Sequence, residues 1–216
     1  MSDRVPGAPA ARAALDDAEF ERLAGWSAIA AGVAGAIYAL AFVVLRQDLL
    51  AGLALLLAPL LTTPALIAVY LRVRVAGPGL ALWALALAIG GSLGAVAHGG
   101  FNLAKAVNPP PVAIDLPFPA DPRGLFTFGL TGLALLGFAW LARRTAGFPR
   151  WVAPLGSVLA LVLVLTYLGR LIVLDAASPF VLGPALVAGV LSPAFYLGLG
   201  WWFLRAPESA SAAGLR

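Results

Sequence analysis

The residues that could take part in chemistry are few and lie within an otherwise apolar chain. His98 is the single histidine of the sequence, and Asn102 and Lys105 follow it in the same long apolar run. In a helix that turns by 100° per residue, these side chains share one stripe with Gly91 and Gly94. Glycines at such spacing let membrane helices approach closely, so we expect the stripe to face another helix rather than lipid.

A second polar group is expected near the end of another apolar run. Arg170 and His98 each lie about 18 residues into their runs, which puts them at a similar depth if both helices start at the same membrane face. Tyr167 lies one helical turn before Arg170, on the same face. Asp175 follows at the end of that run and can pair with Arg170 or Lys105.

These side-chain types predict an anion-binding site more readily than a metal site. An arginine offers two parallel donors to a carboxylate or a phosphate, and imidazole groups can transfer protons near neutral pH. A metal ion needs three or four ligands, which one histidine and distant aspartates do not supply. We therefore expect no metal and no cofactor, and a ligand-binding group made of His98, Asn102, Arg170, Tyr167 and Asp175.

The alternative is that these residues have no ligand. Long cationic side chains near helix ends can extend to the lipid headgroups. If the dipeptide Gly99-Gly100 ended its helix, Lys105 would lie in water and Arg170 could reach the headgroups in the same way. Ionisable residues inside a membrane are otherwise costly and mark ligand or ion pathways.

Six long apolar runs must position these residues. An α-helix needs about 20 apolar residues to cross a hydrocarbon core of about 30 Å, and each run is long enough. The chain is 62% hydrophobic and 11% charged, with a mean hydropathy of +0.96. The predicted fold is therefore an all-α bundle of six transmembrane helices, at residues 25–45, 49–71, 80–107, 124–142, 151–174 and 180–204.

Positive charge and tryptophan predict the same orientation. With a cytoplasmic N-terminus, ten of the 14 Lys and Arg residues fall on the cytoplasmic side, as the positive-inside rule requires. The tryptophans, which favour membrane interfaces, then all fall at cytoplasmic helix ends. We expect a multi-pass protein of the inner (cytoplasmic) membrane with both termini in the cytoplasm. The outer cations are Arg46, Lys105, Arg123 and Arg170; the tryptophans are Trp26, Trp83, Trp140, Trp151, Trp201 and Trp202.

Each segment outside the apolar runs is predicted to have a different structure. Residues 1–24 form a polar tail without the apolar core of a signal peptide, and residues 13–24 can form a short interfacial helix. Residues 205–216 are predicted to be a disordered cytoplasmic tail. Residues 108–123 form an outer loop with six prolines, which is either a lid over an outward cavity or a spacer. Its Asp115 and Asp121 are further counter-ions for the cationic side chains.

Prolines within the runs are expected to kink their helices, because each one frees a backbone carbonyl. Neighbouring hydroxyls can satisfy these carbonyls. The prolines are Pro59, Pro64, Pro184 and Pro193, and the hydroxyl residues beside them are Thr62, Thr63 and Ser192.

Several functional classes are excluded or disfavoured by composition. The chain has no cysteine, which removes disulfides, thiolate metal sites and iron–sulfur clusters. Its positive charge is spread over helix ends, a pattern that favours anionic membrane lipids over nucleic acid as partners. Small-residue faces allow self-association without requiring it.

The fourth and fifth runs resemble a pattern in bacterial multi-pass membrane proteins whose domain has no assigned function. In that pattern an apolar helix ends in a basic turn and the chain re-enters the membrane after a Pro-Arg-Trp step. The resemblance implies a six-helix type of bundle and no known activity or site residues. The residues that carry it are Phe128-Gly129, Leu136-Gly137-Phe138-Ala139-Trp140-Leu141-Ala142-Arg143-Arg144, Phe148-Pro149-Arg150-Trp151 and Leu155-Gly156.

The sequence leaves three functions open. The first is a non-enzymatic membrane protein that binds or passes a small anionic or amphipathic ligand, such as a lipid, at an outward-facing polar pocket. The second is a structural or accessory subunit whose polar residues only fasten helices. The third, a membrane enzyme acting on lipid or isoprenoid substrates with His98 as acid–base, is least favoured, because no nucleophile, base and oxyanion donor come together.

Overall fold

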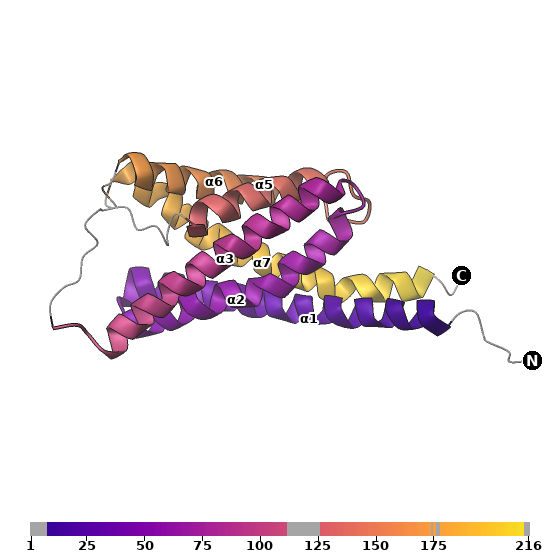
Figure 1. Ribbon diagram of the computed structural model, residues 1–216, viewed down its shortest axis with the longest axis horizontal. Helices are drawn as coiled ribbons and strands as arrows, with labels where there is room; N and C mark the ends of the chain where they lie inside the picture. The colour runs from indigo at the N-terminus through magenta and orange to yellow at the C-terminus, as the bar shows by residue number, and fades with distance from the viewer. Residues whose placement is uncertain (1–7, 112–125, 174, 176–177, 214–216) are drawn as a thin grey trace, which may run out of the picture.

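The protein is all-α, as predicted. The computed structural model describes residues 8–111, 126–173, 175 and 178–213, and for residues 8–17 and 206–213 the backbone alone is described. The elements, drawn in Figure 1, are α1 (Ala8–Ala39) with the π-helical turn η1 (Leu40–Leu45), α2 (Asp48–Val73), α3 (Pro78–Val107), the π-helical turn η2 (Phe126–Leu130) with α5 (Thr131–Ala142), α6 (Val152–Ile172) and α7 (Pro179–Ala213).

Five of these helices are long and apolar enough to cross a membrane. They are Ala18–Leu45, Asp48–Val73, Pro78–Val107, Val152–Ile172 and Pro179–Arg205. The shortest has 21 residues, which at a rise of about 1.5 Å each covers a hydrocarbon core of about 30 Å. The remaining apolar helix, Phe126–Ala142, is shorter. The chain is thus a membrane-embedded helical protein with five helices of spanning length among its described residues.

The helices form a closed ring. Each packs against the next, in the order α1, α2, α3, α5, α6, α7, and α7 returns to α1. Across the ring, α2 also contacts α5 and α7. Figure 1 shows that α1 begins and α7 ends at the same end of the bundle, which we call the tryptophan end. The opposite end, where α3 finishes, is called the histidine end.

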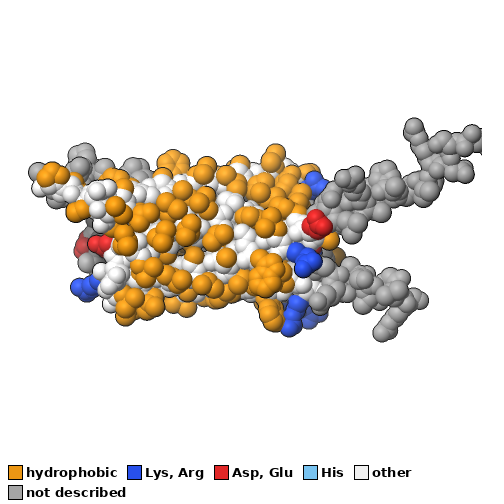
Figure 2. Space-filling view, turned by 90° about the horizontal axis from the view of Figure 1, so that it is seen from below, with side chains coloured by type: hydrophobic (Ala, Val, Ile, Leu, Met, Phe, Trp, Pro, Cys, Tyr) orange, Lys and Arg blue, Asp and Glu red, His pale blue; other side chains and the backbone are white. Residues whose placement is uncertain are grey.

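The distribution of side-chain size is the reverse of that in a soluble domain. Many buried residues are alanines, including Ala24, Ala28, Ala65 and Ala81, and many large apolar side chains are exposed, although some, such as Phe203, are buried. Figure 2 shows one face on which apolar side chains cover the middle and charged side chains lie toward the two ends. Small residues inside let the helices approach, and large ones outside contact lipid.

Glycines make the two closest helix crossings. A Cβ atom added to Gly200 of α7 would lie 2.5 Å from the carbonyl oxygen of Gly25 in α1. A Cβ atom added to Gly99 of α3 would lie 2.5 Å from the backbone nitrogen of Leu56 in α2. Side chains cannot enter where two backbones touch, so both crossings require glycine.

The prolines of α2 are accommodated as predicted. Pro64 cannot donate to the carbonyl of Leu60, four residues earlier, and the hydroxyl of Thr63 donates to that carbonyl at 2.7 Å. The hydroxyl of Thr62 donates to the carbonyl of Pro59 at 2.7 Å. These bonds keep the backbone of α2 satisfied inside the apolar layer.

Two segments differ from expectation, and one alternative is ruled out. Gly99-Gly100 do not end their helix, since α3 continues to Val107, where the predicted run also ends, and Gly99 makes the close contact with α2. Residues 13–24 are no separate interfacial helix but part of the continuous α1. The backbone of residues 206–213, expected to be disordered, continues α7. Of the predicted loop at 108–123, residues 112–123, with Asp115, Asp121 and Arg123, lie outside the described residues.

Candidate functional site

His98 and Asn102 lie on the predicted stripe of α3. The amide Nδ2 of Asn102 and the ring Nε2 of His98 are 3.3 Å apart, one helical turn from each other. The other ring nitrogen, Nδ1, is shielded from solvent. Toward the middle of α3, Gly91 on the same stripe touches Thr131, at the junction of η2 and α5. The stripe therefore faces a neighbouring helix, as the glycines indicated.

Lys105 lies outside the bundle, as the alternative interpretation predicted. Its side chain is exposed near the end of α3, and its Nζ lies 5.6 Å from the ring centroid of Phe101. A long cationic side chain at this position can reach the headgroups while its stem covers apolar surface.

Tyr167 and Arg170 face the inside of the ring from α6. The Tyr167 ring covers Gly129 of η2, where an added Cβ atom would lie 3.2 Å from the ring carbons. Arg170 is partly buried, and Tyr38 of α1 lies within the range of its charge. Tyr38 was not selected from the sequence, although a tyrosine near the outer end of an apolar run is a usable signal.

Of the predicted site residues, His98 and Asn102 are thus neighbours on α3, and Tyr167 packs on η2. Gly91, on the stripe of His98 and Asn102, packs on one part of the η2–α5 segment and Tyr167 packs on another. Asp175 is exposed beyond α6, and its carbonyl accepts the N–H of Ser178 at 3.2 Å. Among the described residues, no carboxylate lies within ion-pairing distance of Arg170. A partly buried guanidinium beside a phenol and without a carboxylate is suited to binding an anion.

A polar cluster in the middle of the bundle was not predicted from the sequence. The hydroxyls of Thr62 in α2 and Ser92 in α3 are 3.3 Å apart, and the buried Tyr196 of α7 lies near Thr62. From α1, Ser27 donates to the carbonyl of Leu61 at 2.8 Å. One hydroxyl in each of four apolar helices is the signal that could have indicated it. The cluster links helices and contains no group suited to binding an anion.

Replacing Thr62 by valine should destabilise this cluster. Valine has nearly the same shape but leaves Ser92 without its hydroxyl partner, at a cost of about 1 kcal/mol for a bond within a membrane. Thr63→Val is the matched control, because the Thr63 hydroxyl bonds only within its own helix. Unfolding in mixed micelles with increasing dodecyl sulfate measures both. Equal losses in the two variants would contradict a cross-helix role for Thr62.

The tryptophan end carries arginines stacked on aromatic rings. The guanidinium carbon of Arg144 lies 4.4 Å from the ring centroid of Trp140, and that of Arg205 lies 4.1 Å from Trp201. Arg72 lies 4.6 Å from Trp202 and also forms two hydrogen bonds with Glu21. Stacked arginine and tryptophan are typical of the level of lipid headgroups.

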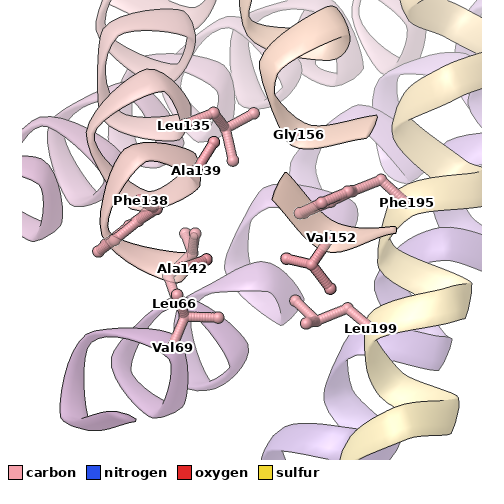
Figure 3. Close-up of a pocket in the computed structure, with 10 residues that line it drawn as sticks. All are labelled: Leu66, Val69, Leu135, Phe138, Ala139, Ala142, Val152, Gly156, Phe195 and Leu199. Atoms are coloured by element: carbon pink, nitrogen blue, oxygen red, sulfur yellow. The ribbon is translucent and has the colours of Figure 1, made fainter. Parts of the chain in front are cut away.

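A cavity near this end is apolar and small. It has room for about 20 Å³ and is lined by Leu66, Val69, Leu135, Phe138, Ala139, Ala142, Val152, Gly156, Phe195 and Leu199 (Figure 3). Small-molecule sites usually have several hundred Å³ and a few polar groups. The cavity has no polar side chain, so it is a packing defect between α2, α5, α6 and α7 and not a polar binding site.

The described residues contain no group of three or more His, Asp or Glu side chains that could hold a metal ion. No protein-family model, curated protein or solved structure matches the chain. Functional inference therefore depends on the geometry of the site itself.

Proposed function

We propose that the chain is a six-span protein of the bacterial inner membrane, with the tryptophan end in the cytoplasm. The common end of the first and last helices supports an even number of crossings, which makes Phe126–Ala142 the sixth span. Among the residues with described side chains, arginines are concentrated at the tryptophan end, which supports the cytoplasmic assignment under the positive-inside rule. They are Arg22, Arg72, Arg74, Arg143, Arg144, Arg150 and Arg205, against Arg46, Lys105 and Arg170 at the histidine end.

At the histidine end, we propose that the protein binds or passes a small anionic or amphipathic ligand. The observation that carries this function is Arg170, which is partly buried and has no ion-paired carboxylate among the described residues. A guanidinium inside a membrane protein is costly unless an anion neutralises it. His98, Asn102, Tyr167 and Asp175 complete the proposed outward-facing site.

The position of the π-helical turns favours the same location. Both η1 and η2 occur toward the histidine end, one directly after Tyr38 and the other against Tyr167. Such turns widen a helix locally and are frequent at functional sites. An amphipathic anion could place its charged group at Arg170 and its apolar chain between the helices or in the lipid.

A structural or accessory role is the second candidate. The hydrogen bond between Asn102 and His98 lies within one helix, so it gives the Nε2 atom of His98 a partner without a ligand. In that case substitutions at His98 and Arg170 change stability alone. An enzyme acting on lipid or isoprenoid substrates is least supported, because the described site offers no nucleophile beside a base.

The test is binding of oleate, a carboxylate with an apolar chain, to the protein in a mild detergent, read by native mass spectrometry. We expect Arg170→Gln to weaken oleate binding about tenfold, because a charge-assisted hydrogen bond to a carboxylate contributes about 1.5 kcal/mol or more. His98→Ala should weaken it less, and a mass that co-purifies with the wild type should be lost from both variants.

Arg46→Gln is the matched control, since Arg46 is an exposed arginine at the same end of the bundle. It should bind oleate like the wild type. A wild type without bound mass or oleate binding, or equal binding in all variants, would favour the accessory role over ligand binding.

A further inference from the structure

The turn between α5 and α6 concentrates positive charge that no acidic residue balances. Arg143, Arg144 and Arg150 lie within eight positions, and the sequence has no Asp or Glu between Asp121 and Asp175. Within the described part of the chain, none of these three arginines has a carboxylate at ion-pairing distance. All three arginine side chains are exposed, so they are open to an anionic group.

Arg143 turns back toward the membrane. Its Nη2 donates to the hydroxyl of Ser157 at 3.2 Å, and that hydroxyl donates to the carbonyl of Ala153 at 2.8 Å. Ser157 lies five residues into α6, about 7 Å along the helix from Val152. The exposed side chain of Arg143 is therefore held along α6 by this hydrogen bond.

Arg144 marks the same level on the neighbouring helix. Its guanidinium carbon lies 4.4 Å from the centroid of the Trp140 ring, which is half exposed on the lipid-facing side of α5. Exposed indole rings favour the headgroup region of a bilayer. Two guanidiniums, each with five N–H donors, are thus held at the α5–α6 hairpin, one by Ser157 and one by Trp140.

We propose that Arg143 and Arg144, with Ser157 and Trp140, bind the phosphate of an anionic phospholipid in the adjoining leaflet. A phosphate oxygen pair fits the forked donors of arginine, and the indole ring supports the apolar part of the lipid next to its headgroup. A soluble acidic partner could reach Arg150 in the turn, but a guanidinium held against the membrane-facing surface of α6 is better placed for a lipid. This site lies at the opposite end of the bundle from Arg170 and does not depend on it.

The test is titration of the detergent-solubilised protein with dioleoylphosphatidylglycerol and, separately, with zwitterionic dioleoylphosphatidylcholine, followed by native mass spectrometry. We expect the wild type to prefer phosphatidylglycerol, and the double variant Arg143→Gln with Arg144→Gln to bind it about tenfold more weakly. The double variant Arg22→Gln with Arg74→Gln is the matched control, because it removes two exposed arginines at the same end of the bundle.

The Ser157→Ala variant tests whether the position of the Arg143 guanidinium matters, and not only its charge. It removes the anchor of Arg143 without changing the net charge, so it should weaken phosphatidylglycerol binding a few-fold and also serves if the double arginine variant does not fold. Equal weakening in the two double variants would overturn the proposal in favour of diffuse attraction between charges. No preference of the wild type for phosphatidylglycerol over phosphatidylcholine, or a Ser157→Ala variant that binds like the wild type, would also overturn it.

Discussion

Replacing Gly200 by alanine should disrupt the packing of α1 against α7 and destabilise the protein by about 3 kcal/mol, at the upper end for overpacked cores. The added Cβ atom would lie 2.5 Å from the carbonyl oxygen of Gly25 and 2.9 Å from the backbone nitrogen of Ile29. Backbone atoms cannot rotate away as a side chain can, so one helix must move. Because α7 closes the ring against α1, that movement also opens the contact between the first and last spans.

Two other glycines of the same helix provide the control. Cβ atoms added to Gly183 and Gly189 of α7 would meet nothing within 4 Å. Alanine there should be neutral or stabilise the helix by up to about 1 kcal/mol, since it has the higher helix propensity. Dodecyl sulfate titration followed by tryptophan fluorescence compares the three variants. A Gly200→Ala protein as stable as the Gly189→Ala protein would contradict a close backbone contact between α1 and α7 at Gly200.

The fold class could be predicted from sequence because lipid restricts the choices. A chain segment in the membrane must satisfy its own backbone hydrogen bonds, so a long apolar run indicates a helix with little ambiguity. The same restriction explains why the alternative at Gly99-Gly100, a helix that ends there, is not observed. In water a glycine pair often ends a helix, but in this bundle Gly99 allows the α3 backbone to touch Leu56 of α2, and the helix continues.

The site was only partly predictable. The direction of the His98 stripe followed from helical periodicity, and the contact of Gly91 with Thr131 agrees with it. Which helix occupies the space opposite the stripe could not be deduced, because the order of helices around a ring depends on contacts between residues far apart in sequence. Tyr38 was missed for this reason, since its neighbour Arg170 belongs to a helix that is distant along the chain.

The ion pair between Glu21 and Arg72 is another contact that the sequence did not indicate. The two residues are 51 positions apart, and both belong to segments where charged side chains are ordinarily exposed. The Nε and Nη2 atoms of Arg72 donate to the two carboxylate oxygens of Glu21 at 2.7 and 2.6 Å. The two side chains are only 26% and 23% exposed, so water screens the pair less than it would on an open surface.

Removal of Arg72 should therefore cost more stability than an exposed arginine would. Arg72→Ala leaves the Glu21 carboxylate partly buried without its partner and uncovers the Trp202 ring, which lies 4.6 Å from the guanidinium carbon. We expect a loss of about 2 kcal/mol, between the values for exposed and fully buried pairs. Glu21→Gln should cost about 1 kcal/mol, because Arg72 keeps its aromatic contacts.

A double-mutant cycle in dodecyl sulfate titrations measures the coupling directly. The double variant should be about 1 kcal/mol more stable than the sum of the two single losses implies, since residues in contact are not additive. Arg72→Lys should recover only part of the loss, because an ammonium keeps the charge but not the forked donors or the planar stacking on Trp202. A coupling near zero would mean that Arg72 stabilises α1, α2 and α7 through its aromatic contacts alone, with Glu21 as a neighbour that contributes nothing.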